Sequence, residues 1–186
     1  MTIRRRFIFV PLLIVIIIAN LYQDEQSQVE RLQVPVDTNE LPDYYMEQLS
    51  IKLFDDNGLL QAAIDSPTLI HYASQAQAEM ERPEITLFAV NDQVWNLTAA
   101  KGRILDESQD IALDEDVLIQ LEKPGTNLVT FETDNLYYEF LAHRAWNESK
   151  VTFNRTDARG SANGLLIDLN TETFELQNQV EVRHQH

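Results

Sequence analysis

Carboxylates and histidines are the side chains of this sequence best suited to acid–base chemistry or metal binding, and cysteine is absent. Acidic residues cluster at Asp55-Asp56 and at Asp114-Glu115-Asp116. Each cluster adjoins a turn or the start of an apolar run, where a solvated loop is the ordinary explanation. A glycosidase would need two carboxylates across a sugar-binding cleft, and the spacing of these clusters does not indicate one.

The histidines lack the spacing of a metal site. His71 and His143 are far apart in the sequence, and His184 and His186 would hold a divalent ion only adventitiously. The sequence also contains no nucleophile elbow and no phosphate-binding glycine loop. We therefore predict a protein that is not an enzyme and that has neither a metal ion nor another cofactor.

Short runs of alternating apolar and polar residues dominate the chain after Met46. Such alternation predicts β-strands with one apolar and one polar face. The clearest runs are Leu49–Leu53, Ile85–Leu87, Val117–Leu121, Val151–Phe153, Phe174–Leu176 and Val180–Val182. Turn sequences rich in Gly, Asn, Asp and Pro separate several of them. The sequence therefore predicts an all-β, antiparallel domain.

The runs also recur along the chain. A small residue followed by an apolar strand occurs at Ser66, Ala99, Thr133 and Ser161, at intervals of roughly 30 residues. This spacing predicts stacked units of two or three strands that together form two facing sheets. Chance similarity among strand sequences is the alternative explanation.

An uncharged apolar segment, Phe7 to Tyr22, follows Arg4, Arg5 and Arg6. As a helix it would span about 24 Å, slightly less than the ~30 Å hydrocarbon core of a bilayer. A cleaved signal peptide has the same basic start, but small residues suited to a cleavage site are missing at the end of this segment. We therefore predict that residues 7–22 form an uncleaved transmembrane anchor.

The three arginines predict the topology, because basic residues stay on the cytoplasmic side of a membrane. Residues 1–6 are then cytoplasmic, and everything after Tyr22 lies in the periplasm of a bacterium. Residues 23–43 are polar and contain Pro35 and Pro42, which is typical of a tether. The folded β-domain is predicted over residues 44–186.

The chain is strongly acidic, with a formal net charge of −16 that includes the three N-terminal arginines. Such a surface repels phosphate backbones, so we predict that the protein does not bind nucleic acid. It also argues against general adsorption to anionic lipid headgroups.

Several segments resemble the LptC family of the lipopolysaccharide export system. They are Leu53–Leu60 (LFDDNGLL), Ala63–Tyr72 (AIDSPTLIHY), Arg82–Phe88, Trp95–Gly102 and Ile111–Val117. Together with the anchor ahead of them, their order and spacing extend the resemblance over nearly the whole chain. The resemblance implies a twisted, open β-jellyroll, tethered to the bacterial inner membrane by a single span.

The resemblance also implies partners and contact residues. The inner-membrane ATP-binding-cassette transporter of LptB, LptF and LptG would deliver lipopolysaccharide at the N-terminal edge, and LptA would receive it at the C-terminal edge. Lipid contacts would fall on Leu49, Met80 and Phe174. Gly58 matches a glycine that supports transporter docking. The chain departs from some members at residues 154–155, where they have glycine.

Shielding acyl chains from water is the physical task that the resemblance implies, since their exposure costs ~0.8 kcal/mol per CH₂. A groove lined by apolar side chains would do this. The candidate lipid-binding residues are Leu49, Ile51, Leu53, Leu69, Met80, Ile85, Leu87, Leu97, Ile104, Val117, Ile119, Phe131, Tyr137, Phe153, Phe174 and Leu176. Ordinary core packing would use the same residues. Since the sequence contains no strong basic cluster, we expect the headgroup to stay in solvent.

Passing a lipid between modules needs open sheet edges to which a neighbour adds a strand. Leu49 to Phe54 are the candidate transporter-facing edge, together with Gly58. Val180 and Val182 mark the candidate LptA-facing edge. Two alternatives stay open: both edges could be ordinary terminal strands, and the β-domain could be an adaptor that tethers a transporter to a soluble partner without binding lipid.

Overall fold

Antiparallel β-strands make up nearly all of the chain that the computed structural model describes, residues 41–89, 92–125 and 128–184. The predicted all-β, antiparallel class is confirmed. The anchor predicted at residues 7–22 and most of the predicted tether lie outside the described residues. Within the described ranges, no helix has the length and apolar character needed to cross a membrane.

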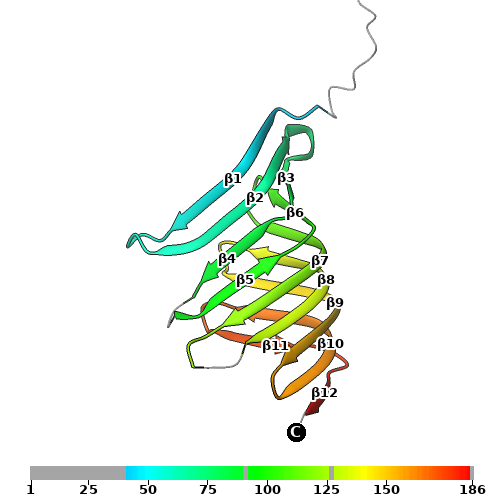
Figure 1. Ribbon diagram of the computed structural model, residues 1–186. Helices are drawn as coiled ribbons and strands as arrows, with labels where there is room; N and C mark the ends of the chain where they lie inside the picture. Colours follow the sequence, from blue (N-terminus) through cyan, green and yellow to red (C-terminus); the bar gives the residue numbers. More distant parts are fainter. Residues whose placement is uncertain (1–40, 90–91, 126–127, 185–186) are drawn as a thin grey trace, which may run out of the picture. The chain divides into compact units, whose positions relative to one another are not determined.

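Twelve strands and one short 3₁₀ helix follow one another in the described ranges (Figure 1). They are β1 (Tyr44–Phe54), β2 (Leu60–Tyr72), η1 (Ala73–Gln75), β3 (Gln77–Glu81), β4 (Glu84–Phe88), β5 (Val94–Thr98), β6 (Lys101–Leu105), β7 (Ile111–Glu122), β8 (Val129–Glu139), β9 (Arg144–Arg155), β10 (Ala158–Asp168), β11 (Thr173–Leu176) and β12 (Glu181–His184).

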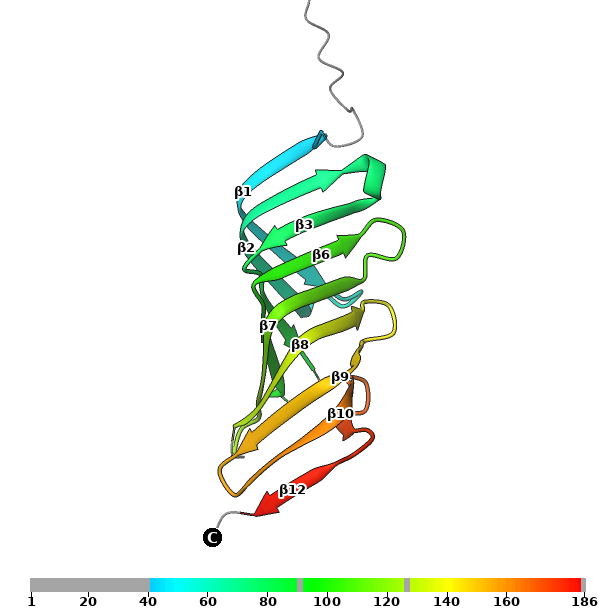
Figure 2. The same cartoon turned by 90° about the vertical axis from the view of Figure 1, so that its right-hand side faces the viewer.

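All of these strands belong to one hydrogen-bonded sheet, which bends into two walls. Strand β2 pairs first with β4 and then with β3. Strand β7 likewise pairs first with β6 and then with β5, and β10 pairs first with β12 and then with β11. The short strands β3, β6 and β11 therefore belong to wall 1, and β4, β5 and β12 belong to wall 2 (Figures 1 and 2). The six long strands cross from one wall to the other.

The bend falls where the backbone leaves ordinary extended geometry. Gln48 in β1 has a φ of 54°, and Glu115 and Asp116 in β7 have φ values of 65° and 52°. In β10 the bend passes through Gly164, whose φ of 122° suits a residue without a side chain. The small residues of the sequence repeat lie at or close to this line, so the repeat reflects the recurring need to turn the chain between the walls.

Polar side chains at the bend bind backbone groups that the sheet ladder leaves free. The Ser66 Oγ lies 2.7 Å and 2.8 Å from two backbone carbonyl oxygens of β2 and β3. Buried Asn147 donates from Nδ2 to the Thr133 Oγ1 at 2.6 Å, and its Oδ1 accepts from the Leu165 N–H at 2.9 Å. Because an unpaired buried polar group is costly, these contacts stabilise the bent strands.

A buried histidine fastens the start of β1 to the rest of the sheet. The Nδ1 of His71 lies 2.8 Å from Asp43 Oδ1, and its Nε2 lies 2.9 Å from Asp106 Oδ2. The Tyr44 ring stacks on the imidazole with the centroids 4.4 Å apart. Carboxylates only accept hydrogen bonds, so both ring nitrogens donate and the imidazole is held as a cation. These bonds, to Asp106 first and then to Asp43, raise the pKa of His71 above its ordinary 6.5.

We expect this clamp to weaken as the solution becomes alkaline. A raised histidine pKa contributes stability that is complete below pH 6.5 and is lost as the pH rises through the folded-state value. On the acid side, the hydrogen bond to His71 lowers the pKa of Asp43 below 3.8, so that contribution is lost only as the pH falls further. In the full chain, the ring signals of His71 should titrate with a midpoint above 6.5 in an NMR experiment.

Replacing His71→Gln provides the matched comparison, because glutamine keeps a polar side chain but cannot carry the charge. The variant should lose part of the stability difference that wild type shows between about pH 6 and about pH 9 in denaturant titrations. A His71 midpoint at or below the ordinary value, or an unchanged pH profile in the variant, would contradict the cationic clamp.

Candidate functional site

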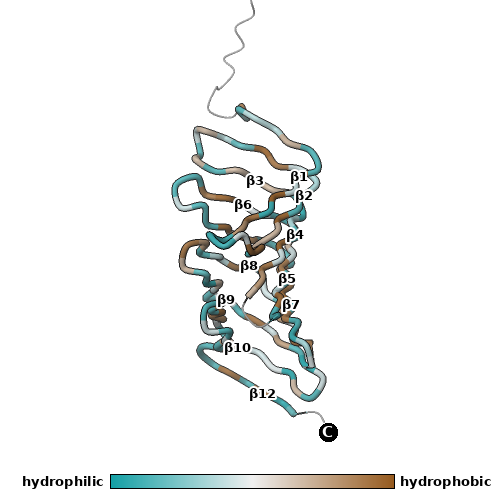
Figure 3. Tube along the Cα trace, turned by 90° about the vertical axis from the view of Figure 1, so that its left-hand side faces the viewer, coloured by the Kyte–Doolittle hydropathy of each residue, from teal (hydrophilic) through white to brown (hydrophobic). Residues whose placement is uncertain are grey.

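Apolar side chains from both walls form one continuous cluster between them. Alternation along each strand directs one set of side chains inward and the other toward solvent, as the alternating hydropathy along the strands in Figure 3 illustrates. From wall 1 the cluster includes Leu69 and Leu113, and from wall 2 it includes Ile85 and Trp95. Apolar side chains of both walls therefore line the interior.

The structure brings together almost all of the residues proposed to line a lipid groove. Those in the middle are buried: Leu69, Met80, Ile85, Leu87, Leu97, Val117, Ile119 and Phe131. Others pack against the same cluster and remain partly exposed: Leu49, Ile51, Leu53, Ile104, Phe153, Phe174 and Leu176. The apolar alternation in the sequence was sufficient to find these positions.

Tyr137 is the exception, because it lies on the outer face of wall 1. Its ring contacts Trp146 with the centroids 5.4 Å apart, and its hydroxyl donates to Asp110 Oδ2 at 2.9 Å. The pairing of β8 shifts register at the bend, which moves its inward positions to Leu136 and Tyr138. Burial there raises the pKa of Tyr138 to about 12. Sequence reasoning missed both residues because the shift interrupts strict alternation.

Side chains fill the middle of the interior. Trp95 is 1% exposed and Phe131 is 0% exposed. Phe131 on wall 2 meets Phe174 on wall 1 edge to face, with the ring centroids 5.0 Å apart. This aromatic pair joins the two walls directly. At this level the interior is a packed core.

The two ends of the interior are more open than its middle. At the β1 end, Met46 is 44% exposed and Leu49 is partly buried. At the β12 end, Val182 is 47% exposed beside the partly buried Phe153. These two strands lie at opposite ends of the stack of strands (Figures 1 and 2). Apolar surface is thus accessible at both ends of one continuous apolar interior.

A cavity of about 510 Å³ opens between the walls beside Phe174. Apolar side chains of β7 and β8, Leu121 and Val129, line it together with the charged Lys123 and Glu172. The Lys123 Nζ donates to Glu172 Oε2 at 3.4 Å, which connects the end of β7 on wall 2 to the start of β11 on wall 1. The aromatic pair is therefore bordered by an opening with a polar rim.

The candidate docking edges are edges of the sheet in the described part of the chain, where β1 pairs only with β2 and β12 pairs only with β10. Gly160 of β10 lies opposite Val182 of β12. A Cβ atom at Gly160 would overlap the backbone oxygen of Glu181 and would lie 2.5 Å from a ring carbon of Phe153. The absence of a side chain at Gly160 is what lets β12 approach this closely.

The β1–β2 turn, at the other edge, depends on Gly58 and Asp55. Gly58 has a φ of 80°, and its N–H donates to the Asp55 carbonyl at 2.9 Å. The Asp55 carboxylate accepts from the Leu59 N–H at 2.7 Å, and this bond is the main cause of the lowered pKa of Asp55. Hydrogen bonds within the turn therefore hold its shape, and the carboxylate has a structural role in it.

The other acidic cluster is also engaged in structural contacts. Asp114 binds Arg103 at 2.8 Å, and Glu115 binds Lys101 at 2.7 Å. Across residues 41–89, 92–125 and 128–184, no group of three or more histidines and carboxylates could hold a metal ion. The carboxylates of Asp55, Asp114 and Glu115 are therefore all engaged in turn hydrogen bonds or ion pairs.

Comparisons with known proteins agree with this architecture. No curated protein matches the chain. Among solved structures, the chain is similar to LptH, the LptA-homologous periplasmic component of the lipopolysaccharide transport device of Pseudomonas aeruginosa, with a TM-score of 0.53 and 8% identity. That match covers 67% of this chain and 95% of LptH, and at such low identity it shows a shared fold.

The family comparison extends further along the chain. A model described as "Lipopolysaccharide-assembly, LptC-related" matches residues 10–185. This range includes the two edges, the bend and all the residues of the apolar interior. The chain therefore belongs to the LptC-related family of lipopolysaccharide-assembly proteins.

Proposed function

We propose that this protein is the membrane-anchored, lipopolysaccharide-binding component of a bridge that exports lipopolysaccharide across the bacterial envelope. Family membership and the LptA-like fold support a role in lipopolysaccharide transport. Families of this kind are transport components rather than enzymes. The observation that carries the finer proposal is one continuous apolar interior whose two ends are partly exposed.

Acyl chains would occupy the interior between the walls. Each buried CH₂ group is favoured by ~0.8 kcal/mol, so several chains supply ample affinity without a charged clamp. Because Phe131 and Phe174 touch across the interior, the walls must separate or these rings must turn before a chain can pass. The cavity beside Phe174 opens to the side, and the sugar headgroup would protrude there and stay in water.

The proposed partners come from the resemblance to the LptC family, and the two open edges of the sheet are compatible with them. Residues 7–22 would hold the protein in the inner membrane, with residues 1–6 in the cytoplasm and the β-domain in the periplasm. The ATP-binding-cassette transporter of LptB, LptF and LptG would dock at the β1 edge, and LptA would add a strand at the β12 edge. Head-to-tail addition of sheets would align the apolar interiors of neighbouring modules.

A second function, that of an adaptor without bound lipid, is favoured by one observation. The middle of the interior is filled, with Phe131 fully buried against Phe174. An adaptor would need only the two edges and a stable core. The two proposals differ in whether lipopolysaccharide ever contacts the inward side chains.

Photo-crosslinking in cells distinguishes these functions. We expect a photoreactive amino acid at Leu49, Met80 or Phe174 to capture lipopolysaccharide, because these side chains face the interior. The matched control is Tyr137, which lies on the outer face and should capture none. Covalent adducts are detected by immunoblotting for lipopolysaccharide. If export continues while all three inward positions capture nothing, the adaptor is correct and the carrier is wrong.

The β12 edge can be tested with Gly160→Val. The new side chain would overlap the Glu181 backbone, so β12 should detach from β10 and the affinity for LptA should fall at least about tenfold, or ~1.4 kcal/mol. Hydrogen exchange at β12 amides reports the detachment, and co-purification reports both partners. Thr171→Val, in the exposed turn before β11, is the control. Full LptA binding despite a detached β12 would exclude this edge.

The β1 edge can be tested with Gly58→Val. A β-branched residue at a φ of 80° is strained, so we expect a loss of about 1–2 kcal/mol in stability and weaker association with the transporter. Leu59→Val, in the same exposed turn, should change neither property appreciably. Intact LptA binding would show that the Gly58→Val variant is folded. If this folded variant also binds the transporter as wild type does, the transporter does not dock at the β1 edge.

A further inference from the structure

Most lysines and arginines of the described ranges form ion pairs with nearby carboxylates. The paired residues are Arg82, Lys101, Arg103, Lys123, Arg144 and Arg155. Lys52, Lys150, Arg159 and Arg183 make no ion pair with any described residue. In a chain with a net charge of −16, cations that lack an acidic partner are unexpected.

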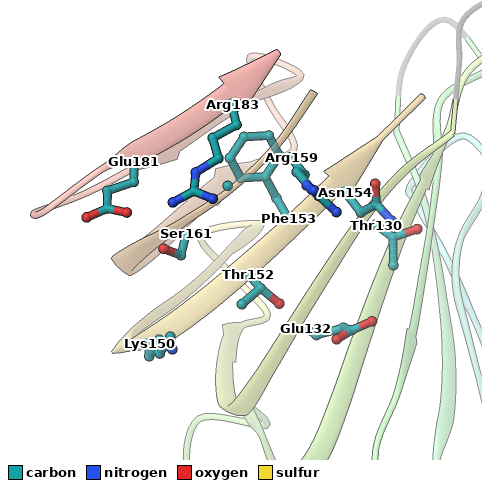
Figure 4. A pocket seen from close by; sticks show the side chains of 11 residues that line it. Thr130, Glu132, Lys150, Thr152, Phe153, Asn154, Arg159, Ser161, Glu181 and Arg183 are labelled. Carbon is teal, nitrogen blue, oxygen red and sulfur yellow. The ribbon is translucent and has the colours of Figure 1, made fainter. Parts of the chain in front are cut away.

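Three of these four cations converge on one surface. Lys150 from β9, Arg159 from β10 and Arg183 from β12 line a depression of about 410 Å³ on the outer side of wall 2 (Figure 4). We call these three residues the cationic face. They lie on three separate strands and are not adjacent in the sequence, which is why the sequence indicated no basic cluster.

Two members of the cationic face oppose each other directly. Arg159 and Arg183 are register partners in the antiparallel pairing of β10 with β12. Like charges at directly opposed positions destabilise a sheet. Glu132 and Glu181 line the same depression, yet neither forms an ion pair with these cations. The fold therefore contains a pair of mutually repulsive arginines, one of which lies on the edge strand β12.

We propose that the cationic face binds the carboxylates of an acidic β-strand that a second protein adds to β12. This inference rests on the proposed docking of a partner at β12 and specifies the chemistry of that partner. A strand paired with β12 would place its outward side chains about 5 Å from that of Arg183. Aspartate or glutamate at these positions would relieve the repulsion between the opposed arginines.

A second copy of this chain fits the site poorly. The outward positions of β1 on wall 2 are Ser50, Lys52 and Phe54, so its own N-terminal edge strand would bring another cation to Arg183. Phosphates of a bound lipid also fit poorly, because the cationic face lies on the opposite side of wall 2 from the apolar interior. The favoured occupant is therefore an acidic edge strand of a different protein.

Charges beside an interface act mainly on the rate of association. Complementary charges accelerate the encounter of two proteins, whereas backbone pairing at the edge governs how slowly they separate. The cationic face would thus select the partner as it approaches. Its effect should diminish as added salt screens the charges.

The test compares the full chain with a triple variant, Lys150→Gln, Arg159→Gln and Arg183→Gln, using purified LptA as the probe. At low salt the variant should associate about tenfold more slowly than wild type, and the difference should vanish near 1 M NaCl. The dissociation rate should change less than about threefold. Lys52→Gln, which removes the unpaired cation at the opposite edge, is the matched control and should bind LptA as wild type does.

Two further measurements separate a docking role from a structural one. The triple variant should unfold at the same temperature as wild type or higher, because it removes a repulsive pair. Glu181→Gln should accelerate association with LptA, because it removes a carboxylate from the depression. A less stable triple variant, or one that binds LptA at the wild-type rate in low salt, would overturn the proposal.

The failure of this inference can be distinguished from failure of the proposed function. If Gly160→Val abolishes LptA binding while the triple variant binds normally, β12 docking stands and the cationic face has no part in it. Vesicles containing lipopolysaccharide test the remaining occupant. Loss of vesicle binding in the triple variant with LptA binding unchanged would assign the cationic face to lipid phosphate and overturn the acidic strand.

Discussion

Burial of one apolar sheet face, in a domain whose described part has no α-helix to cover it, is the constraint on which the structure depends. A sheet with one apolar side must cover that side with something. Here the sheet covers itself, because the long strands bend and bring their inward side chains together. Every bend interrupts the backbone ladder, and polar residues such as Ser66 and Asn147 bind the groups that are released. The bend therefore forms the apolar core and also leaves backbone polar groups that need hydrogen bonds from side chains.

The same constraint explains why the interior differs along its length. In the middle, side chains from the two walls meet, as Phe131 and Phe174 do. At the ends each strand has a neighbour on only one side, so residues such as Met46 and Val182 stay exposed. The core of such a domain is closely packed in the middle, whereas its apolar side chains at the two ends are only partly buried. A module that continues the sheet would complete the burial, which links the proposed lipid transfer and the proposed partner docking to one property of the fold.

Electrostatics distinguishes the two ends. At the β1 end, the cation of His71 is enclosed by Asp43 and Asp106 and holds the first strand in place. At the β12 end, Arg159 and Arg183 face each other without an acidic partner in the described residues. The first arrangement is satisfied within the chain, whereas the second would be satisfied only by a group from outside. A fixed end and a receptive end suit the proposed place of the protein between two different partners.

The sequence by itself determined the all-β class, the positions of several strands and the inward orientation of nearly all the residues proposed to line the interior, because a period of two is a local property of a strand. It also carried the family resemblance that the comparison over residues 10–185 supports.

Three features were decided only by the tertiary structure. A register shift at the bend turned Tyr137 outward and Leu136 inward. Packing between the walls closed the middle of the interior. Pairing of β9, β10 and β12 brought Lys150, Arg159 and Arg183 onto one surface. Each depends on how separate strands pair and pack, and local periodicity carries no information about which strands become neighbours or in which register.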